Sequence, residues 1–566
     1  MTNKTLLISA CAVLTAFVGA CSSPFQTVDA DYGVRVRLER LRTIEPLDLQ
    51  RAVVEPGAEQ MPHGGTIDAF ETLERQTLTL EECRALALRH NLDLRVALID
   101  PTTSDLRVSE EEAAFEAIFT AGYTRSETDQ PTASNLDGSQ TRRDGYNLGV
   151  SVPLRSGGTI DFSLPFSRFE TDNSFSTLNP SYTSDFEISY SQPLLRDFGR
   201  RASTFGIRIA AIESQITQAL TKLEVIRTLA AVDRAYWDLY AAQKLLEVRR
   251  RQYELAVEQL NQAERRVRAG DAAEIEITRA QSGVADQLEA IILAETDVRS
   301  FLRNLKVIIN APGMEIEGDP YIEIGTDPDP VPYQLNAAEL IGTAMNMRME
   351  LLELELRLAQ DESTIEFRKN QQLPSFAFDY TYRYNGLGRS FDRSFDQLTD
   401  GDFADWSVGF NFQTPIGNEA AKSRTQQAVV ARLQRLSTRS ARELAIRQEV
   451  VGALDQLEAS WQRILAARQR VLLAARTLEA EQNQFNVGLR TSTDVLDAAT
   501  NLADAQSAEV RALADYQIAQ TDLAFATGTL LGASKVQWAP IDPRTDLNTS
   551  SPDGVVLDPV EKTSSR

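Results

Sequence analysis

Two carboxylates near a glycine are the residues of this sequence best suited to electrostatic chemistry. Asp494 and Asp497 follow Gly488 and Arg490, and residues 491–493 (TST) are candidate N-caps for a new helix. A spacing of three places both carboxylates on one face of the first helical turn. They would complement the positive end of the helix dipole. If several copies of the chain met around an axis, they would instead form an acidic ring that attracts cations. Residue types alone leave both interpretations open.

Other chemistry finds little support. The 566 residues include two histidines, His63 and His90, and contain no GxxxxGK[ST], HExxH or GxSxG motif. His90, beside Asn91, is interpreted as a polar residue at a helix end. We therefore predict no enzyme, no cofactor and no metal site. The net charge of −23 and pI near 4.7 argue against a nucleic-acid partner. The same acidity fits either an acidic internal passage that favours cations or a charged surface that keeps the protein soluble.

The N-terminus predicts export and lipidation. An apolar run from Leu6 to Ala20 follows Lys4 and ends in VGAC at Cys21, which resembles a bacterial lipobox. The run is short for a membrane span and typical of a signal peptide. We predict a signal peptide over 1–20 and a lipidated extension over 21–77, with Cys21 as the lipidated residue. The alternative is an ordinary signal peptide with an incidental cysteine. Ser22 permits sorting to the outer membrane.

An internal repeat organises the rest of the chain. Gly270 and Gly488 end two similar helical stretches at a spacing of 488 − 270 = 218, and Pro193 and Pro415 repeat at 415 − 193 = 222. Residues 87–94 and 344–351 match loosely at 344 − 87 = 257, so the first half holds about 257 − 222 = 35 extra residues. We predict repeats over 78–311 and 335–532, a proline-rich linker over 312–334 and a disordered tail over 533–566.

Each repeat predicts a very long helix. Residues 201–269 contain no proline and one glycine, and residues 419–487 likewise, so each stretch would extend on the order of 100 Å. The second stretch carries apolar positions at alternating steps of three and four, interrupted by Arg468 and Gln482. This is coiled-coil spacing. The positions are Leu454, Leu457, Trp461, Ile464, Val471, Ala475, Leu478 and Phe485.

Period-two alternation predicts strands before both long helices. Aromatic residues occupy every second position of 376–384, and residues 406–413 alternate in the same way, which suits a hairpin with a polar loop. The first half offers four such segments: 115–123, 146–154, 160–168 and 182–194. Strands with one apolar and one polar face, in an exported chain, favour a transmembrane barrel.

Residues 485–530 (FNVGLRTSTDVLDAATNLADAQ and onward) resemble the second periplasmic hairpin of TolC-like outer membrane efflux proteins, and residues 406–418 (WSVGFNFQTPIGN) resemble their exit from strand to helix. With the duplicated plan, the resemblance covers roughly 78–531. It implies an α+β membrane protein: a homotrimer whose transmembrane β-barrel continues into an antiparallel α-helical coiled-coil barrel. It also implies an outer-membrane location reaching into the periplasm, a periplasmic adaptor protein and an inner-membrane pump as partners, and passage of substrates unaltered.

The resemblance also assigns roles at the two turns. Asp494 and Asp497 match an acidic ring at the periplasmic constriction, and Arg490 matches an arginine that helps to hold the tip shut. Glu276 stands where the family often has an aspartate, and Phe485 stands where a gate tyrosine occurs but lacks its hydroxyl. Arg265, Arg266 and Arg268 would pair with acidic groups of the gate or adaptor, or form a solvated basic face.

Two rival functions remain open at this stage. The same fold could serve efflux or type I protein secretion, and a lipid-anchored coiled coil could bridge the envelope layers without conducting anything.

We interpret the extra residues of the first half as an added hairpin from Tyr146 to Arg168, with long polar links on both sides over 124–145 and 169–181. If both of its strands enter the wall, a trimer has eighteen strands rather than the twelve that the resemblance implies. Pro153 and Pro165 favour an edge or a flap instead.

Overall fold

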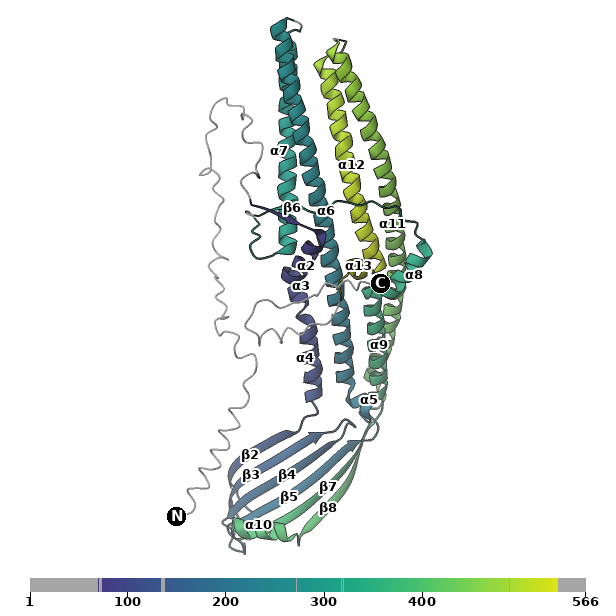
Figure 1. Cartoon of the computed structure of the whole chain (residues 1–566). Helices are drawn as coiled ribbons and strands as arrows, with labels where there is room; N and C mark the ends of the chain where they lie inside the picture. Colours follow the sequence, from purple (N-terminus) through teal and green to yellow (C-terminus); the bar gives the residue numbers. More distant parts are fainter. Residues whose placement is uncertain are drawn as a thin grey trace, which may run out of the picture. The chain divides into compact units, whose positions relative to one another are not determined.

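The computed structural model describes residue 70 and residues 74–133, 138–270, 272–316, 318, 320–487 and 489–537. All of them belong to one compact unit, Asp68–Arg566. Cys21, the signal peptide, His63, Gly488 and most of the C-terminal tail lie outside the described residues. Within the unit, one sheet lies at one end and the ends of two helical hairpins lie at the other (Figure 1).

The two halves of the chain contain elements in a similar order. The first half contains α2 (Leu80–His90), α3 (Leu92–Ala97), α4 (Asp100–Ala113), β2 (Ile118–Asp129), β3 (Gln140–Pro153), β4 (Thr159–Thr171), β5 (Ser181–Pro193), α5 (Arg200–Ser203), α6 (Phe205–Ala269) and α7 (Ile275–Ile309). The second half contains α8 (Ala337–Met347), α9 (Met349–Asn370), β7 (Ser375–Gly388), α10 (Phe391–Asp400), β8 (Ala404–Gln413), α11 (Glu419–Asn486), α12 (Ser492–Thr527) and α13 (Leu530–Ala533).

The duplication extends to single hydrogen bonds. Asn91 separates α2 from α3, and Arg348 separates α8 from α9, at the predicted spacing of 348 − 91 = 257. The Asn91 amide donates to the carbonyl oxygen of Ile308 at 2.9 Å, and the Arg348 guanidinium donates to that of Ala526 at 3.1 Å. The two acceptors are 526 − 308 = 218 residues apart, the spacing of the two turns. Each half therefore fixes its opening helices to the end of its own hairpin.

One antiparallel sheet holds six strands in the order β2-β3-β4-β5-β7-β8. The added hairpin thus joins the sheet, because β3 pairs with β2 and β4 while β4 pairs with β5. Adjacent rows across the sheet face opposite sides. One row is apolar in every strand: Phe119, Val150, Phe162, Ile188, Tyr382 and Trp406. The next row is small or polar: Thr120, Gly149, Ser163, Glu187, Arg383 and Asp405.

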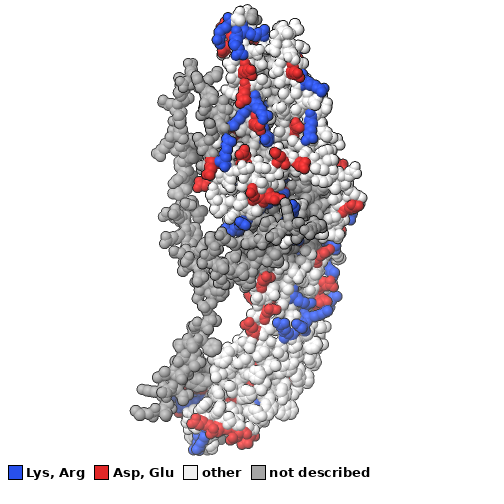
Figure 2. Space-filling model, viewed as in Figure 1, with Lys and Arg blue, Asp and Glu red and all other residues white. Residues whose placement is uncertain are grey.

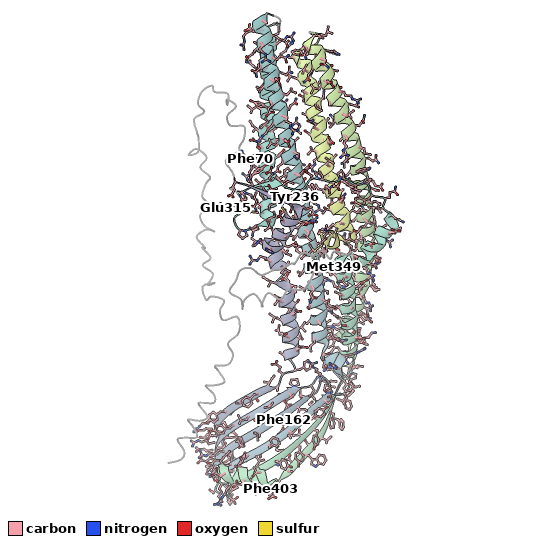
Figure 3. All side chains as sticks on the ribbon, in the orientation of Figure 1. Phe70, Phe162, Tyr236, Glu315, Met349 and Phe403 are labelled. Carbon is pink, nitrogen blue, oxygen red and sulfur yellow. The ribbon has the colours of Figure 1, made fainter. Side chains whose placement is uncertain are left out.

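The apolar face is visible as a broad surface without charges in Figure 2. Phe162, labelled in Figure 3, lies in the middle of the sheet and is 39% exposed. Trp406 and Phe410 of the edge strand β8 are 68% and 64% exposed. An apolar surface of this extent marks contact with a membrane or another protein.

The prolines of the added hairpin are accommodated inside the sheet, not at its edge. Pro153 is the last residue of β3, where it ends the ladder opposite Thr159. Pro165 lies within β4, and the pairing of β4 with β5 is interrupted between Ser163 and Phe166. The register is unchanged on both sides of this gap. Because Pro165 has no N–H, the hydrogen-bond ladder between β4 and β5 is interrupted locally. The interpretation of the added hairpin as an edge or a flap is wrong.

Two expectations for the connections were also wrong. The link between the first two strands is shorter than predicted, because β2 continues to Asp129 and β3 begins at Gln140. The polar loop expected between β7 and β8 contains the helix α10, which packs on β5 and β7. The hydroxyls of Ser394 and Ser184 are 2.7 Å apart, and a side chain at Gly386 would meet the backbone of α10. Small residues thus seat the helix on the sheet.

The long helices form two antiparallel hairpins, α6 with α7 and α11 with α12, and α6 also packs against α12. The predicted seam of α11 is confirmed over Leu454, Leu457, Trp461 and Ile464, which pack with Tyr516 and other residues of α12. The interrupting Arg468 is half-exposed and pairs with Glu509 of α12 at 3.5 Å. No helix among the described residues is long and apolar enough to cross a membrane.

A short parallel pair of strands, β1 (Arg75–Leu78) and β6 (Tyr321–Ile324), was not anticipated. It joins the start of the first repeat to the proline-rich linker. The buried Tyr236 hydroxyl of α6 donates to the carbonyl oxygen of Leu78 at 3.2 Å and accepts from the backbone N–H of Thr326 at 3.0 Å. Figure 3 places Tyr236 midway along the hairpins. The linker is therefore fastened to α6.

Candidate gate at the ends of the helical hairpins

The turn of the first hairpin depends on a glycine in the left-handed region. Helix α6 ends at Ala269, and Gly270 has φ = +81° while its N–H reaches the carbonyl oxygens of Arg266 and Val267. A side chain at this φ would be strained, which explains a glycine at this position. The equivalent Gly488 lies outside the described residues, between the end of α11 and Leu489.

Asp494 stabilises the start of α12. The Thr491 hydroxyl accepts from the Asp494 N–H at 3.4 Å, and the Asp494 carboxylate accepts from the Thr491 N–H and hydroxyl, both at 2.9 Å. Together these bonds form a capping box. The hydrogen bonds from the Thr491 backbone and hydroxyl lower the pKa of the Asp494 carboxyl below its ordinary value of 3.8. Among the three N-cap candidates, the T-x-x-D spacing singles out Thr491.

Asp497 lies one turn further along α12 and is exposed. Among the described residues it forms no ion pair, so its charge faces solvent in the single chain. Arg490 instead folds back on α11. Its Nε lies 3.1 Å from Glu481 Oε2 and 3.0 Å from Gln484 Oε1. The structure of one chain thus brings Asp494 and Asp497 onto one helical turn and gives Arg490 partners within its own hairpin.

Glu276 connects the two hairpins. Its carboxylate accepts a hydrogen bond from the Ser492 hydroxyl at 2.8 Å and pairs with Arg279 at 2.8 Å. By the repeat spacing, 494 − 276 = 218, Glu276 is the counterpart of Asp494. The two carboxylates nevertheless do different things, because Asp494 caps its own helix while Glu276 reaches the opposite one. Ser492 is therefore a residue of this site that sequence reasoning considered only as a possible N-cap.

Phe485 is buried between the hairpins, with 4% of its surface exposed. It belongs to a cluster with Leu478 of α11 and Val495 of α12, and Leu255 of α6 packs against this cluster. The Arg266 guanidinium lies 4.8 Å from the centre of the Phe485 ring, within cation–π range. Of the neighbouring arginines, Arg268 pairs with Glu264 on its own helix at 3.0 Å. Phe485 lacks the hydroxyl that a tyrosine would have at this position. It joins the hairpins by packing instead.

Chemistry of other kinds is not evident in the described residues. No group of three or more His, Cys, Asp or Glu side chains among them is placed to hold a metal ion. Cys83 is fully buried, and burial raises the pKa of its thiol to about 12. A thiol in this state is a poor nucleophile at neutral pH.

Comparison with known proteins identifies the family of this chain. A model of the family described as outer membrane efflux protein matches residues 159–311 and 340–529, which is more than half of the chain. The chain belongs to the outer membrane efflux protein family. The matched residues of this family member include Glu276, Phe485, Arg490, Asp494 and Asp497, whereas β2 and β3 precede the match.

Relatives of this efflux protein confirm the resemblance seen in the sequence. The outer membrane protein TolC of Vibrio cholerae is 28% identical over 308 residues, covering 53% of this chain and 67% of that protein. The CmeC outer membrane channel of Campylobacter jejuni superposes with a TM-score of 0.60 at 16% identity, covering 80% of this chain and 86% of that one. The MtrE channel of Neisseria gonorrhoeae, in its open state, gives 0.58 at 16% identity, with 80% and 89% covered. The structural likenesses show the fold alone.

Proposed function

We propose that this efflux protein forms a homotrimeric outer-membrane channel that serves as the exit duct of a tripartite efflux or type I secretion system. It would pass substrates unaltered across the periplasm and outer membrane, in contact with a periplasmic adaptor and an inner-membrane pump. One observation carries the proposal. A six-stranded sheet that carries an apolar row of residues across all six strands is continuous in the chain with two hairpins whose long helices have 65 and 68 residues.

The sheet is suited to closure with copies of itself. Within the described chain, β2 and β8 each pair on one side only, which leaves a row of backbone donors and acceptors at either edge. All neighbouring strands are antiparallel and their number is even, so β8 of one copy would lie antiparallel to β2 of the next. Three copies of six strands would give a barrel of eighteen. A barrel of that size leaves an aqueous channel.

The helices also present a surface for a second copy. Exposed apolar residues on α11 recur at steps of seven or fourteen: Val430, Leu444, Val451, Leu465 and Leu472, each 39% to 67% exposed. This stripe differs from the seam that contacts α12. A second heptad stripe on a helix that already has a partner predicts a further helix beside it. A neighbouring protomer in the tube wall would supply that helix.

The gate would lie at the hairpin ends. Asp494 and Asp497 of three protomers would form an acidic ring around the axis, where field lines concentrate and cations are favoured. The Glu276–Ser492 hydrogen bond and the packing of Phe485 would hold the two hairpins of each protomer together. Arg490, bound to Glu481, would hold the second turn in its closed arrangement.

We also propose that Cys21 carries lipids that tether the channel to the outer membrane, while the barrel itself holds it there. The alternative function, a lipid-anchored structural coiled coil without transport, leaves the sheet unexplained. An apolar face across six strands has no place in a rod that stands in the periplasm.

Reconstitution of the purified full-length protein tests the proposal. We expect a trimer by light scattering in detergent and discrete, cation-preferring conductance steps in a planar bilayer. A monomer, or a protein that inserts into vesicles without conducting, would contradict the channel and favour the structural alternative. Type I secretion and efflux share this readout, so the pump and adaptor encoded beside the gene would separate them.

A further inference from the structure

A group of arginines surrounds a cavity where the sheet joins the helices. The cavity has a volume of about 770 Å³. Its basic residues come from separate segments: Arg155 from the turn between β3 and β4, Arg200 and Arg201 from α5, and Arg208 from the first turns of α6. Residues of α4 and α9 complete the wall. Four guanidinium groups are thus gathered around one hollow.

The balance of charge at the cavity is positive. Three glutamates, Glu112, Glu362 and Glu366, also line it, so the formal charge is 4 − 3 = +1 in a chain whose net charge is −23. Glu366 is shared by two arginines, Arg201 at 3.4 Å and Arg208 at 3.6 Å. Glu362 pairs at 3.5 Å with an arginine of α11 outside the cavity.

Two of the four arginines lack a carboxylate partner. Across the part of the chain that the structure describes, neither Arg155 nor Arg200 forms an ion pair, and both are exposed. Arg155 stacks over Phe115 at 5.9 Å, which holds its stem while leaving its N–H groups available. Guanidinium groups match the oxygens of a phosphate in geometry and charge. The ligand that would complete this cavity is therefore an anion with several oxygen atoms.

Two exposed apolar residues lie close in sequence to the arginines of α5. Leu195 and Phe198, immediately before α5, are 38% and 52% exposed. Figure 2 shows charged side chains gathered next to the uncharged face of the sheet, in the region where Figure 1 labels α5 and α9. The basic cavity is thus continuous with the surface that would face lipid. Such a boundary is where a lipid places its phosphate, with its acyl chains against the apolar wall.

We propose that this cavity binds the phosphate of an anionic glycerophospholipid from the membrane leaflet facing the periplasm. The proposal rests on the proposed function, because it requires the sheet to span a membrane. Arg155 and Arg200 would supply the uncompensated positive charge, and Arg201, whose side chain is 84% exposed, would add further donors. Leu195 and Phe198 would contact the first part of the acyl chains.

Native mass spectrometry of the full-length protein in detergent tests this site. Phosphatidylglycerol would be titrated onto the wild type and the double variant Arg155→Gln/Arg200→Gln, with dioleoylglycerol as the phosphate-free lipid. We expect at least about tenfold weaker retention by the double variant, since charge-assisted hydrogen bonds are lost. The control is Arg227→Gln, an exposed arginine of α6 outside the cavity, whose ion-pair partner in the described part of the chain is Glu224. It should bind as the wild type does.

Each outcome decides the matter. Equal retention by the double variant, or equal binding of dioleoylglycerol, overturns the site. Inorganic phosphate that binds as tightly as phosphatidylglycerol would show a phosphate site without lipid selectivity, which also overturns it. Conductance of the same preparations is measured separately. A conducting channel without lipid selectivity rejects this inference alone, and lipid binding by a protein that does not conduct rejects the proposed function.

Discussion

The Ser492 hydroxyl donates a 2.8 Å hydrogen bond to the Glu276 carboxylate and so joins the first turns of α12 and α7 across 216 residues of chain. The bond is partly buried, and the Glu276 side chain is 18% exposed. It is a charge-assisted contact between two hairpins that would have to separate if the duct opens at this end. Ser492 and Glu276 are therefore the residues through which closure can be tested most directly.

Removing this hydrogen bond should favour the open state. For Ser492→Ala we expect a loss of about 1 kcal/mol, which is roughly a fivefold shift in the closed-to-open ratio, measured as open probability in a planar bilayer. Thr493→Ala is the matched control, because Thr493 is exposed and its neighbour makes the bond. In a double-mutant cycle with Glu276→Ala, the two effects should not add. Additive effects would show that the contact does not hold the gate.

The two aspartates of α12 should separate into different roles. Asp497→Asn should reduce cation preference and block by trivalent cations without destabilising the helix start, because Asp497 is exposed and outside the capping box. Asp494→Asn should reduce cation preference and also hydrogen-exchange protection of the first turn of α12. Unchanged ion selectivity in the double variant would leave these carboxylates with the helix-dipole role alone.

The same capping box predicts a pH dependence. The pKa of Asp494 is lowered in the folded protein, so its contribution is fully present above the ordinary value of 3.8 and is lost as pH falls through the lower folded value. Protection of the α12 start should therefore be constant from neutral pH down to mildly acidic pH and should decline only below 3.8. Protection that already declines near neutral pH would contradict this assignment.

Adjacent residues of β4 should report opposite environments. Phe162 belongs to the apolar row and Ser163 to the polar row of the sheet. In vesicles of brominated phospholipid, Phe162→Trp should be strongly quenched, while Ser163→Trp should be quenched by a water-soluble agent instead. Each variant should be compared with the wild type to subtract its native tryptophans. Equal quenching of both by lipid would place the added hairpin outside the barrel wall.

Thiol counting tests the two cysteines that would remain after signal cleavage. Cys83 is buried with a pKa of about 12, so it should not react with maleimide in the native protein and should react after denaturation. If Cys21 carries lipids, the denatured protein has one reactive thiol, and Cys21→Ser abolishes labelling by a radioactive fatty acid. Two reactive thiols, or label that persists in Cys21→Ser, would reject the lipid anchor.

The sequence by itself determined the duplicated plan, the two long helices and the existence of six strands. These follow from signals within one segment: a period of two in 376–384, steps of three and four in α11, and a glycine at 270 where the turn requires φ = +81°. The spacing of 257 between Asn91 and Arg348 likewise survives in the structure as two equivalent helix breaks. Local periodicity is enough because it depends only on neighbouring side chains.

Only the tertiary structure decided which charged residues meet. Residues 124–129 read as a loop because their positions on the apolar face hold Arg125 and Glu127, yet the strand continues there. Ion pairs replace apolar pairs: Arg125 pairs with Glu127 of its own strand at 2.9 Å, and Arg142 of β3 pairs across the strands with the same carboxylate at 2.7 Å. Likewise Glu276 and Asp494 occupy equivalent places in the repeat, but one bonds across the hairpins and the other caps its own helix. The partners of Glu127 on β3 and of Glu276 on α12 depend on strand register and helix packing between distant segments, which no local pattern of side chains encodes.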